Sequence, residues 1–308
     1  MNKLNTSVIG QHEAKRKVLA AFMMHILRTA QRARNPDVME FPSHKTSVLL
    51  MGPTGVGKTL TIETLAKAVN MPFVKIDATQ ITPSGYVGKS IGEAIFSQIE
   101  ALSKTFTAKQ LKYTIVFIDE VDKLATGGSE SSFYAKIQST LLRIIEGTEL
   151  DKLERKPLHT NHMMFIFAGN FEKIRKLREV ASDQKTIGFT EVNKTLPKDV
   201  DVTEELIKFG MLGELVGRMS VVTQLQDLTK EDYRKVLVES DVSPYRNYVD
   251  TLKTAGIDAN LSESEITNIV ERAIKKKTGL RSLVSLVAEA FEDKILTSKY
   301  WEGENIDE

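Results

Sequence analysis

The fold of this chain is decided by the stretch Gly52-Pro53-Thr54-Gly55-Val56-Gly57-Lys58-Thr59-Leu60. Its first eight residues match the pattern G-x-x-x-x-G-K-[ST], which is typical of a phosphate-binding loop between a strand and a helix. The glycines allow backbone N–H groups to face phosphate oxygens, and the start of the helix adds partial positive charge. We expect Lys58 to reach the β- and γ-phosphates of a nucleotide and the Thr59 hydroxyl to bind Mg²⁺. The alternative is a glycine turn before a helix that arises by chance.

The residues on both sides of this loop alternate between short apolar runs and helical patterns. We expect strands at Ser47–Met51, Phe73–Ile76, Thr114–Ile118 and Met163–Ala168. We expect helices between them at Lys58–Val69, Ile91–Leu102 and Phe133–Ile145. Alternation of this kind predicts a parallel sheet with helices packed on it, which is an α/β fold.

The last third of the chain has a different pattern, in which helices follow one another. Thr229 opens a Thr-x-x-Asp pattern and Ser262 opens a Ser-x-x-Glu pattern, both typical of helix starts. A final helix is expected over Ser282–Leu296, and a short β-like piece near Ile257–Leu261. We therefore predict a large nucleotide-binding domain at residues 1–222 and a small, mainly helical domain at residues 223–308.

Two carboxylates follow the apolar run that ends at Ile118. They are Asp119 and Glu120, and ligands bind at the carboxyl ends of strands in sheets of this kind. We expect Asp119 to hold Mg²⁺ through water and Glu120 to polarise the water that attacks the γ-phosphate. By themselves, two such carboxylates would more often form a solvated turn. The complete phosphate loop favours the catalytic interpretation.

Composition narrows the class of protein. Lys and Arg number 42 against 41 Asp and Glu in 308 residues, so there is no overall charge that would attract nucleic acid or an anionic membrane. The absence of cysteine excludes disulfides, thiolate zinc sites and a cysteine nucleophile. No apolar run approaches the ~20 residues that span a bilayer. We expect a cytoplasmic protein without membrane or nucleic-acid partners.

Several further segments occur in a fixed order along the chain. They are Val8-Ile9-Gly10-Gln11, Gly85-Tyr86-Val87-Gly88, Leu141–Thr148, Phe209-Gly210 with Glu214–Arg218, and Gly279-Leu280-Arg281-Ser282. Together with the phosphate loop, this order resembles the Clp unfoldases of the AAA+ class, and the ClpX family most closely, from about Val8 to Leu296. The resemblance implies an AAA+ large domain with a smaller helical domain, and ATP and Mg²⁺ as cofactors. It also implies that Val8 and Ile9 lie beside the adenine.

The same resemblance assigns roles to three polar side chains. Arg218 is expected to be the arginine finger that reaches the nucleotide of the neighbouring subunit, with a helix-end arginine that caps carbonyls as the alternative. Arg281 is expected to be the sensor 2 residue, which contacts phosphate from the small domain of its own subunit, unless it is solvated at a helix start. Asn170 occupies the place of sensor 1 and would orient the lytic water, or else belongs to a turn.

Two loops are expected to meet other proteins. Gly85, Tyr86, Val87 and Gly88 resemble the pore loop that grips substrate chains, because one aromatic ring on a mobile loop contacts any polypeptide. Ile187, Gly188 and Phe189 resemble the tripeptide that docks on a ClpP-type peptidase, with two apolar anchors for hydrophobic pockets. In each case a local turn packed on its own subunit is the alternative.

These expectations combine into an ATP-dependent protein unfoldase and translocase. It would form a homo-oligomeric ring, expected to be a hexamer, and would thread protein substrates into a ClpP-type peptidase. The sequence as it stands shows no peptidase signature and no zinc-binding domain before the module. A stand-alone remodelling chaperone, an HslU-like ATPase and a nucleic-acid remodeller are the alternatives.

Overall fold

The computed structural model describes residues 2–34, 45–83, 88–125, 131–153, 156–176, 202–257 and 259–296. The chain divides into two compact units. The first, called the helical unit below, comprises Met1–Gln11, Pro53–Thr64 and Gln226–Glu308. The second, called the sheet unit, comprises His12–Gly52 and Leu65–Leu225. The helix α3 (Lys58–Ala68) begins in the helical unit and ends in the sheet unit.

The sheet unit is built on a five-stranded sheet in the order β2-β3-β6-β1-β7, in which every neighbouring pair is parallel. Its strands are β1 (Ser47–Met51), β2 (Phe73–Asp77), β3 (Ile115–Asp119), β6 (Met164–Gly169) and β7 (Val221–Gln224). Four of them confirm the strands expected from the sequence, with bounds that differ by at most one residue. The parallel α/β sheet was therefore predicted correctly, although β7 was missed.

The three central strands of the sheet are continuous apolar runs in the sequence, and their burial explains this pattern. Every residue of β1 and β6 is buried, and β3 is buried up to Ile118. Strands of a parallel sheet covered on both faces have this pattern. Ile118 pairs with Phe167 and Met51 pairs with Gly169, so the carboxyl ends of β3, β6 and β1 lie at one edge of the sheet.

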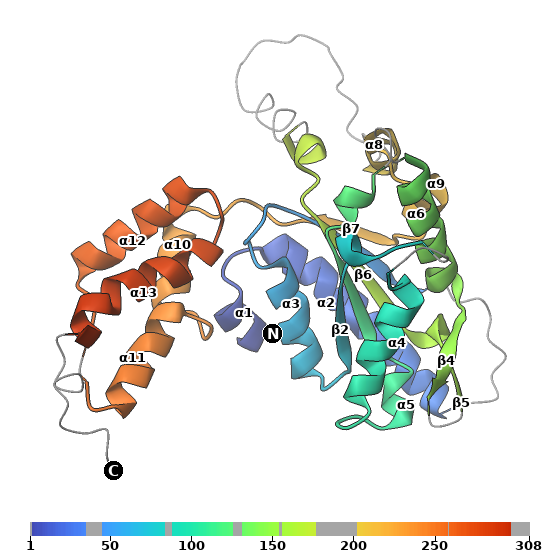
Figure 1. Cartoon of the computed structure of the whole chain (residues 1–308), viewed down its shortest axis with the longest axis horizontal. Helices are drawn as coiled ribbons and strands as arrows, with labels where there is room; N and C mark the ends of the chain where they lie inside the picture. The colour runs from blue at the N-terminus through green and yellow to red at the C-terminus, as the bar shows by residue number, and fades with distance from the viewer. Residues whose placement is uncertain are drawn as a thin grey trace, which may run out of the picture. The chain divides into compact units, whose positions relative to one another are not determined.

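Helices and a hairpin complete the sheet unit (Figure 1). The helices are α2 (His12–Arg34), α4 (Ile91–Leu102), α5 (Ala108–Leu111), α6 (Ser131–Glu146), α8 (Val202–Phe209) and α9 (Gly213–Gly217). Short 3₁₀ turns are η1 (Ala78–Gln80), η2 (Val121–Leu124) and η3 (Thr160–His162), and the antiparallel hairpin is β4 (Glu149–Leu153) with β5 (Lys156–His159). Helix α2 contacts β1 and β7, and α4 contacts β2 and the hairpin strand β4.

The helical unit contains α1 (Asn2–Ser7), α10 (Lys230–Val238), α11 (Pro244–Thr254), α12 (Glu263–Lys276) and α13 (Arg281–Leu296). Figure 1 shows α10 to α13 beside one another, and α13 contacts both α11 and α12. Phe291 is fully buried and stacks on Tyr245 and Tyr248, with ring centroids 6.1 and 5.5 Å away. This apolar core is closed by the four C-terminal helices.

Local sequence signals placed these helices well. Thr229 and Ser262 each form a capping box, with Asp232 and Glu265 as the reciprocal partners, as expected. The strand expected near Ile257–Leu261 was wrong, because its described residues, 257 and 259–261, are not extended in a sheet. A strand needs a neighbouring strand to satisfy its backbone, and the described part of the helical unit offers only helices and turns.

Candidate functional site

The phosphate loop has the conformation that its glycines allow. Gly52 continues from β1 and donates its N–H to the carbonyl of Gly169 over 3.1 Å, which ties the loop's start to β6. Gly55 has a φ of 78° and Gly57 a φ of 97°, a region that residues with a Cβ atom rarely adopt. The Lys58 ammonium donates to the carbonyl of Pro53 over 2.8 Å, so the lysine curls back over its own loop. Thr59 and Leu60 lie in the first turn of α3.

The loop is also in close backbone contact with the segment expected to contain sensor 2. The N–H of Leu280 donates to the carbonyl of Gly55 over 3.0 Å, inside the helical unit. A methyl group built on Gly279 would lie only 2.4 Å from the carbonyl oxygen of Thr54, and one on Gly55 would lie 2.7 Å from the carbonyl of Thr278. Both glycines are therefore needed for this approach. Arg281 begins α13 directly after the contact and is exposed.

The residues expected beside the adenine lie in the same unit as the loop. Val8 is buried, and a methyl group on Gly57 would lie 3.8 Å from its Cγ1 atom. Ile9 is partly buried and packs against the core formed by α10 to α13. These two side chains are thus set between the glycine loop and the helical core.

The acidic pair ends the central strand β3. Asp119 is largely covered, and one of its oxygens accepts the N–H of Glu120 over 3.0 Å while the other lies 3.6 Å from the Lys75 ammonium. Glu120 is exposed and has a φ of 58°, a left-handed conformation that costs a residue with a side chain roughly 1 kcal/mol or more. The sharp turn separates the two carboxylates, one held against the sheet and one presented outward.

Asn170 follows β6, the neighbour of β3 in the sheet. Its Oδ1 atom is buried and has no hydrogen-bond partner within the part of the chain that the structure describes. A buried acceptor without a partner costs about 1–3 kcal/mol, so it points to a missing donor. A side chain that stabilised only its own turn would have bonded to the backbone nearby. A water molecule or a ligand is one source of such a donor.

Arg218 caps the C-terminus of α9 through its backbone N–H. The guanidinium lies 2.6 Å from a carboxylate oxygen of Glu146, and the two side chains are 50% and 43% exposed. An exposed pair of this kind contributes only about 0–1 kcal/mol, so another anion can replace Glu146 at small cost. The observed partner is a carboxylate at the end of α6, and not the helix-end carbonyls of the alternative interpretation.

The two loops expected to meet other proteins fall outside the described residues. Gly85, Tyr86 and Val87 belong to residues 84–87, and Ile187, Gly188 and Phe189 belong to residues 177–201. The base of the first loop is described, because Thr82 donates its backbone N–H to the carbonyl of Lys89 over 3.2 Å. Gly88 lies next to this bond.

The structure adds contacts that no local pattern indicated. Glu146 as the partner of Arg218, and the loop at Ser240 and Asp241 that contacts α1, involve residues far apart in the sequence. No spacing rule connects such positions, and a signal for them would require knowledge of the fold.

None of the described helices is long and apolar enough to cross a bilayer.

A strand–loop–helix with this glycine cradle, followed by a carboxylate pair on a central parallel strand, defines a P-loop ATPase. A family profile described as "AAA domain (Cdc48 subfamily)" matches residues 43–222, so the class is that of the AAA ATPases, and ATP is the nucleotide. The chain is 32% identical to a Treponema denticola protein named "ATP-dependent Clp protease ATP-binding subunit ClpX", over 97% of this chain and 76% of that protein. A Porphyromonas gingivalis protein of the same name is 30% identical, over 96% and 75% respectively. The chain belongs to the ClpX family.

Proposed function

We propose that this ATPase unfolds proteins and threads them, as a homo-oligomeric ring of six subunits, into a ClpP-type peptidase. The observation that carries the proposal is similarity over nearly the whole chain to two relatives named as ATP-binding subunits of Clp protease. The working parts would be a large domain at residues 1–222 and a small domain at residues 223–308. We place the ring in the cytoplasm.

The phosphate loop and Asp119 supply the groups that an ATP–Mg²⁺ complex needs. Lys58 would pair with the β- and γ-phosphates, and the Thr59 hydroxyl would bind Mg²⁺ together with Asp119 through water. The Mg²⁺ ion supplies charge neutralisation on the phosphates when it is bound. Two observations support this assignment: the positive φ of Gly55 and Gly57, and the fixed orientation of the Asp119 carboxylate.

Glu120 and Asn170 would act on the attacking water. Glu120 is exposed at the carboxyl end of its strand and would accept the proton of the water as the new bond to phosphorus forms. The unsatisfied Asn170 oxygen could accept the second hydrogen of the same water and so orient it. The orphaned oxygen is the structural feature that supports this role.

Two arginines would couple hydrolysis to movement. Arg218 would leave Glu146 and reach the nucleotide of a neighbouring copy, where it neutralises charge that develops on the γ-phosphoryl group. Arg281 would contact phosphate from the small domain of the same copy, which the neighbouring contact of Leu280 with Gly55 supports. Tyr86 would then move substrate along the ring axis, and Ile187 with Phe189 would dock on the peptidase.

The ATPase part of the proposal is tested by Glu120→Gln. We expect turnover to fall by about 10²–10⁴-fold, because the base is lost, while the affinity for ATP is retained. The matched control is Glu100→Gln on the exposed face of α4, which should hydrolyse ATP at the original rate. Unchanged hydrolysis in the Glu120 variant would refute its assignment as the base.

The peptidase part is tested separately with ATPase measurements on size-resolved oligomers, with and without a ClpP-type peptidase. Replacing Ile187 and Phe189 by alanine should abolish stimulation of the peptidase and leave basal ATP hydrolysis in place. Equal stimulation by the variant would favour another docking surface. Absence of any stimulation by the original protein would favour a stand-alone remodelling chaperone.

A further inference from the structure

The N-terminal segment 2–11 belongs to the helical unit although it is far from that unit's other helices in the sequence. Helix α1 has six residues and no described capping side chain, so it cannot be stable by itself. Leu4 and Val8 of this segment are nevertheless buried, with 2% and 3% of their surface exposed. The contacts that hold the segment in place therefore decide where Val8 and Ile9 lie.

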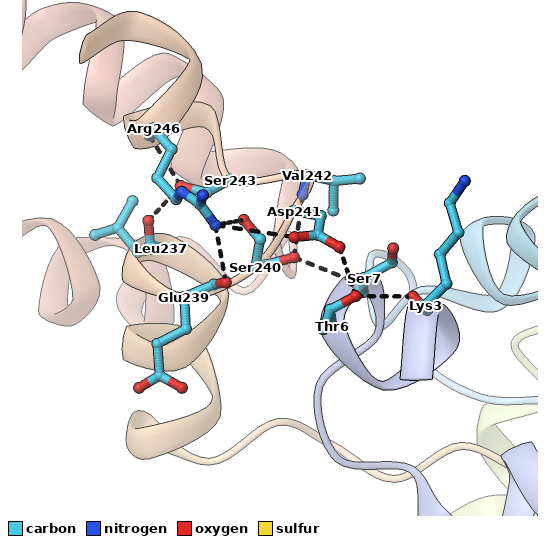
Figure 2. Close-up of polar contacts among 10 residues, drawn as sticks. All are labelled: Lys3, Thr6, Ser7, Leu237, Glu239, Ser240, Asp241, Val242, Ser243 and Arg246. Atoms are coloured by element: carbon cyan, nitrogen blue, oxygen red, sulfur yellow. Dashed lines mark hydrogen bonds and ion pairs between the residues drawn. The ribbon is translucent and has the colours of Figure 1, made fainter. Parts of the chain in front are cut away.

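The first set of contacts joins α1 to the loop between α10 and α11. Figure 2 shows the Thr6 side chain directed at Asp241 of that loop, and the Thr6 hydroxyl donates to the carboxylate over 2.5 Å across 235 positions of sequence. The backbone N–H of Asp241 returns a bond to the Thr6 carbonyl over 3.1 Å. The buried Ser240 hydroxyl donates to the Ser7 carbonyl over 3.1 Å.

The loop that provides these contacts is itself fixed by the start of α11. The Arg246 guanidinium donates to the carbonyls of Glu239 and Ser240 over 3.2 and 3.4 Å, and lies 3.9 Å from the Asp241 carboxylate (Figure 2). The Ser243 hydroxyl caps α11 by accepting the N–H of Arg246 over 3.1 Å. The contacts of Arg246 therefore hold the loop in a conformation that directs the Asp241 carboxylate toward Thr6.

A second set of contacts holds the other end of the segment. The Gln11 side-chain amide donates to the carbonyl of Gln226 over 2.9 Å and accepts the N–H of the same residue over 2.8 Å. The Gln11 amide therefore bonds to both the N–H and the carbonyl of Gln226, as a neighbouring strand would. Val8 and Ile9 lie between the two sets of contacts, next to Gly57 and the helical core respectively.

We propose that Asp241, acting through Thr6, is a positioning residue for nucleotide binding, because it holds the base-side segment Val8–Ile9 to the small domain. The inference rests on the proposed role of Val8 and Ile9 beside the adenine. Neither Asp241 nor Thr6 is a catalytic residue, so their loss weakens the affinity for ATP and leaves the chemical step intact.

The test measures KM and kcat for ATP hydrolysis by the full chain. We expect Thr6→Val and Asp241→Ala each to raise KM about three- to tenfold, the effect of one net hydrogen bond, with kcat unchanged at saturating ATP. The double variant should be no worse than either single variant, because the two groups act as one unit. Thr6→Ser keeps the hydroxyl and should restore the original KM. Asp250→Ala removes an exposed carboxylate from α11 and serves as the control.

The outcomes separate this inference from the proposed function. If both single variants kept the original KM, or if kcat and thermal stability fell with KM unchanged, the contact would be merely structural and the inference overturned. If the original protein hydrolyses ATP in the same experiment, the ATPase assignment is retained even when the variants overturn the inference. Original protein that neither binds nor hydrolyses ATP would overturn both.

Discussion

The sheet unit and the helical unit are assembled by different means. In the sheet unit, the central strands β1, β3 and β6 are nearly continuous apolar runs, and neighbouring strands pair along their whole length. The residues expected to act on ATP follow those strands directly, at the edge where the carboxyl ends meet. The strands that stabilise this unit thus also place Asp119, Glu120 and Asn170.

The helical unit is assembled from three separate pieces of the chain. Its four C-terminal helices share an apolar core, and the other two pieces join it through a small number of hydrogen bonds, such as Leu280 N–H to Gly55 and Thr6 to Asp241. We therefore expect one substitution at a junction to disturb the helical unit more than one substitution disturbs the sheet, which distributes its stability over many residues. The following predictions challenge that difference, in order of decreasing effect.

Phe291→Ala should have the largest effect on stability. The side chain is completely buried in the core of the helical unit. Its removal leaves a cavity, so we expect a loss of about 3–5 kcal/mol in the free energy of unfolding. Val284 lies on the same helix but is 56% exposed, so Val284→Ala should cost about 0.5 kcal/mol or less. Denaturant unfolding followed by circular dichroism measures both. Similar losses would mean that the core does not dominate the helical unit.

His25 gives the sheet unit a pH-dependent stability. Burial is the main cause that lowers the pKa of its imidazole from 6.5 to about 4; the charges of Arg32, Arg28 and His162 act in the same direction, and a bond to the Tyr113 carbonyl opposes them. The neutral form is favoured in the folded state, so this contribution is complete above pH 6.5. As the pH falls from 6.5 to 4 the unfolded chain binds the proton first, and up to about 3 kcal/mol is lost.

The check is the slope of unfolding free energy against pH between 6.5 and 5, where most carboxylates remain ionised. His25→Gln keeps a donor for the Tyr113 carbonyl and has no proton to gain, so its slope should be shallower. An identical slope in the two proteins would contradict the prediction.

Gly279→Ala tests how tight the junction at the phosphate loop is. Its φ of 64° disfavours a side chain, and the added methyl group would also meet the Thr54 carbonyl, so we expect a loss of about 2–3 kcal/mol. Gly256 has a similar φ of 76° but no atom within 4 Å of the added methyl group, so Gly256→Ala isolates the backbone term of about 1 kcal/mol. In thermal unfolding, Gly279→Ala should therefore lower the melting temperature more than Gly256→Ala does. Equal effects would show that the phosphate loop can move away from the added methyl group.

The ion pair between Arg272 and Glu289 should matter least. It joins α12 to α13 with Nη2 and a carboxylate oxygen 2.8 Å apart, and both side chains are substantially exposed. Arg272→Met should therefore change the free energy of unfolding by less than about 1 kcal/mol, and less still at high salt. A double-mutant cycle with Glu289→Gln measures the pair. A coupling larger than this would give polar surface contacts more weight in the helical unit than we assign.

Much of the fold and site could be predicted because the signals are local. An apolar run such as Ser47–Met51 indicates a strand that is buried on both faces. The capping box at Ser262 satisfies the backbone N–H groups at a helix start. Gly55 and Gly57 allow a positive φ in the phosphate loop. Each depends on residues within a few positions of one another. The strands, most helices and the glycine cradle followed from these properties. The roles assigned to individual residues remain predictions, including those of Lys58, Glu120, Arg218, Tyr86 and Ile187–Phe189.

The sequence by itself therefore determined the class of the protein and its α/β sheet. Only the tertiary structure decided that β7 pairs with β1, that Glu146 holds Arg218, and that Asp241 reaches Thr6. The physical reason is that these contacts depend on how distant segments pack. An edge strand as short as Val221–Gln224 is partly exposed and acquires its pattern only from its neighbour, and a hydrogen bond across 235 positions leaves no periodic signal.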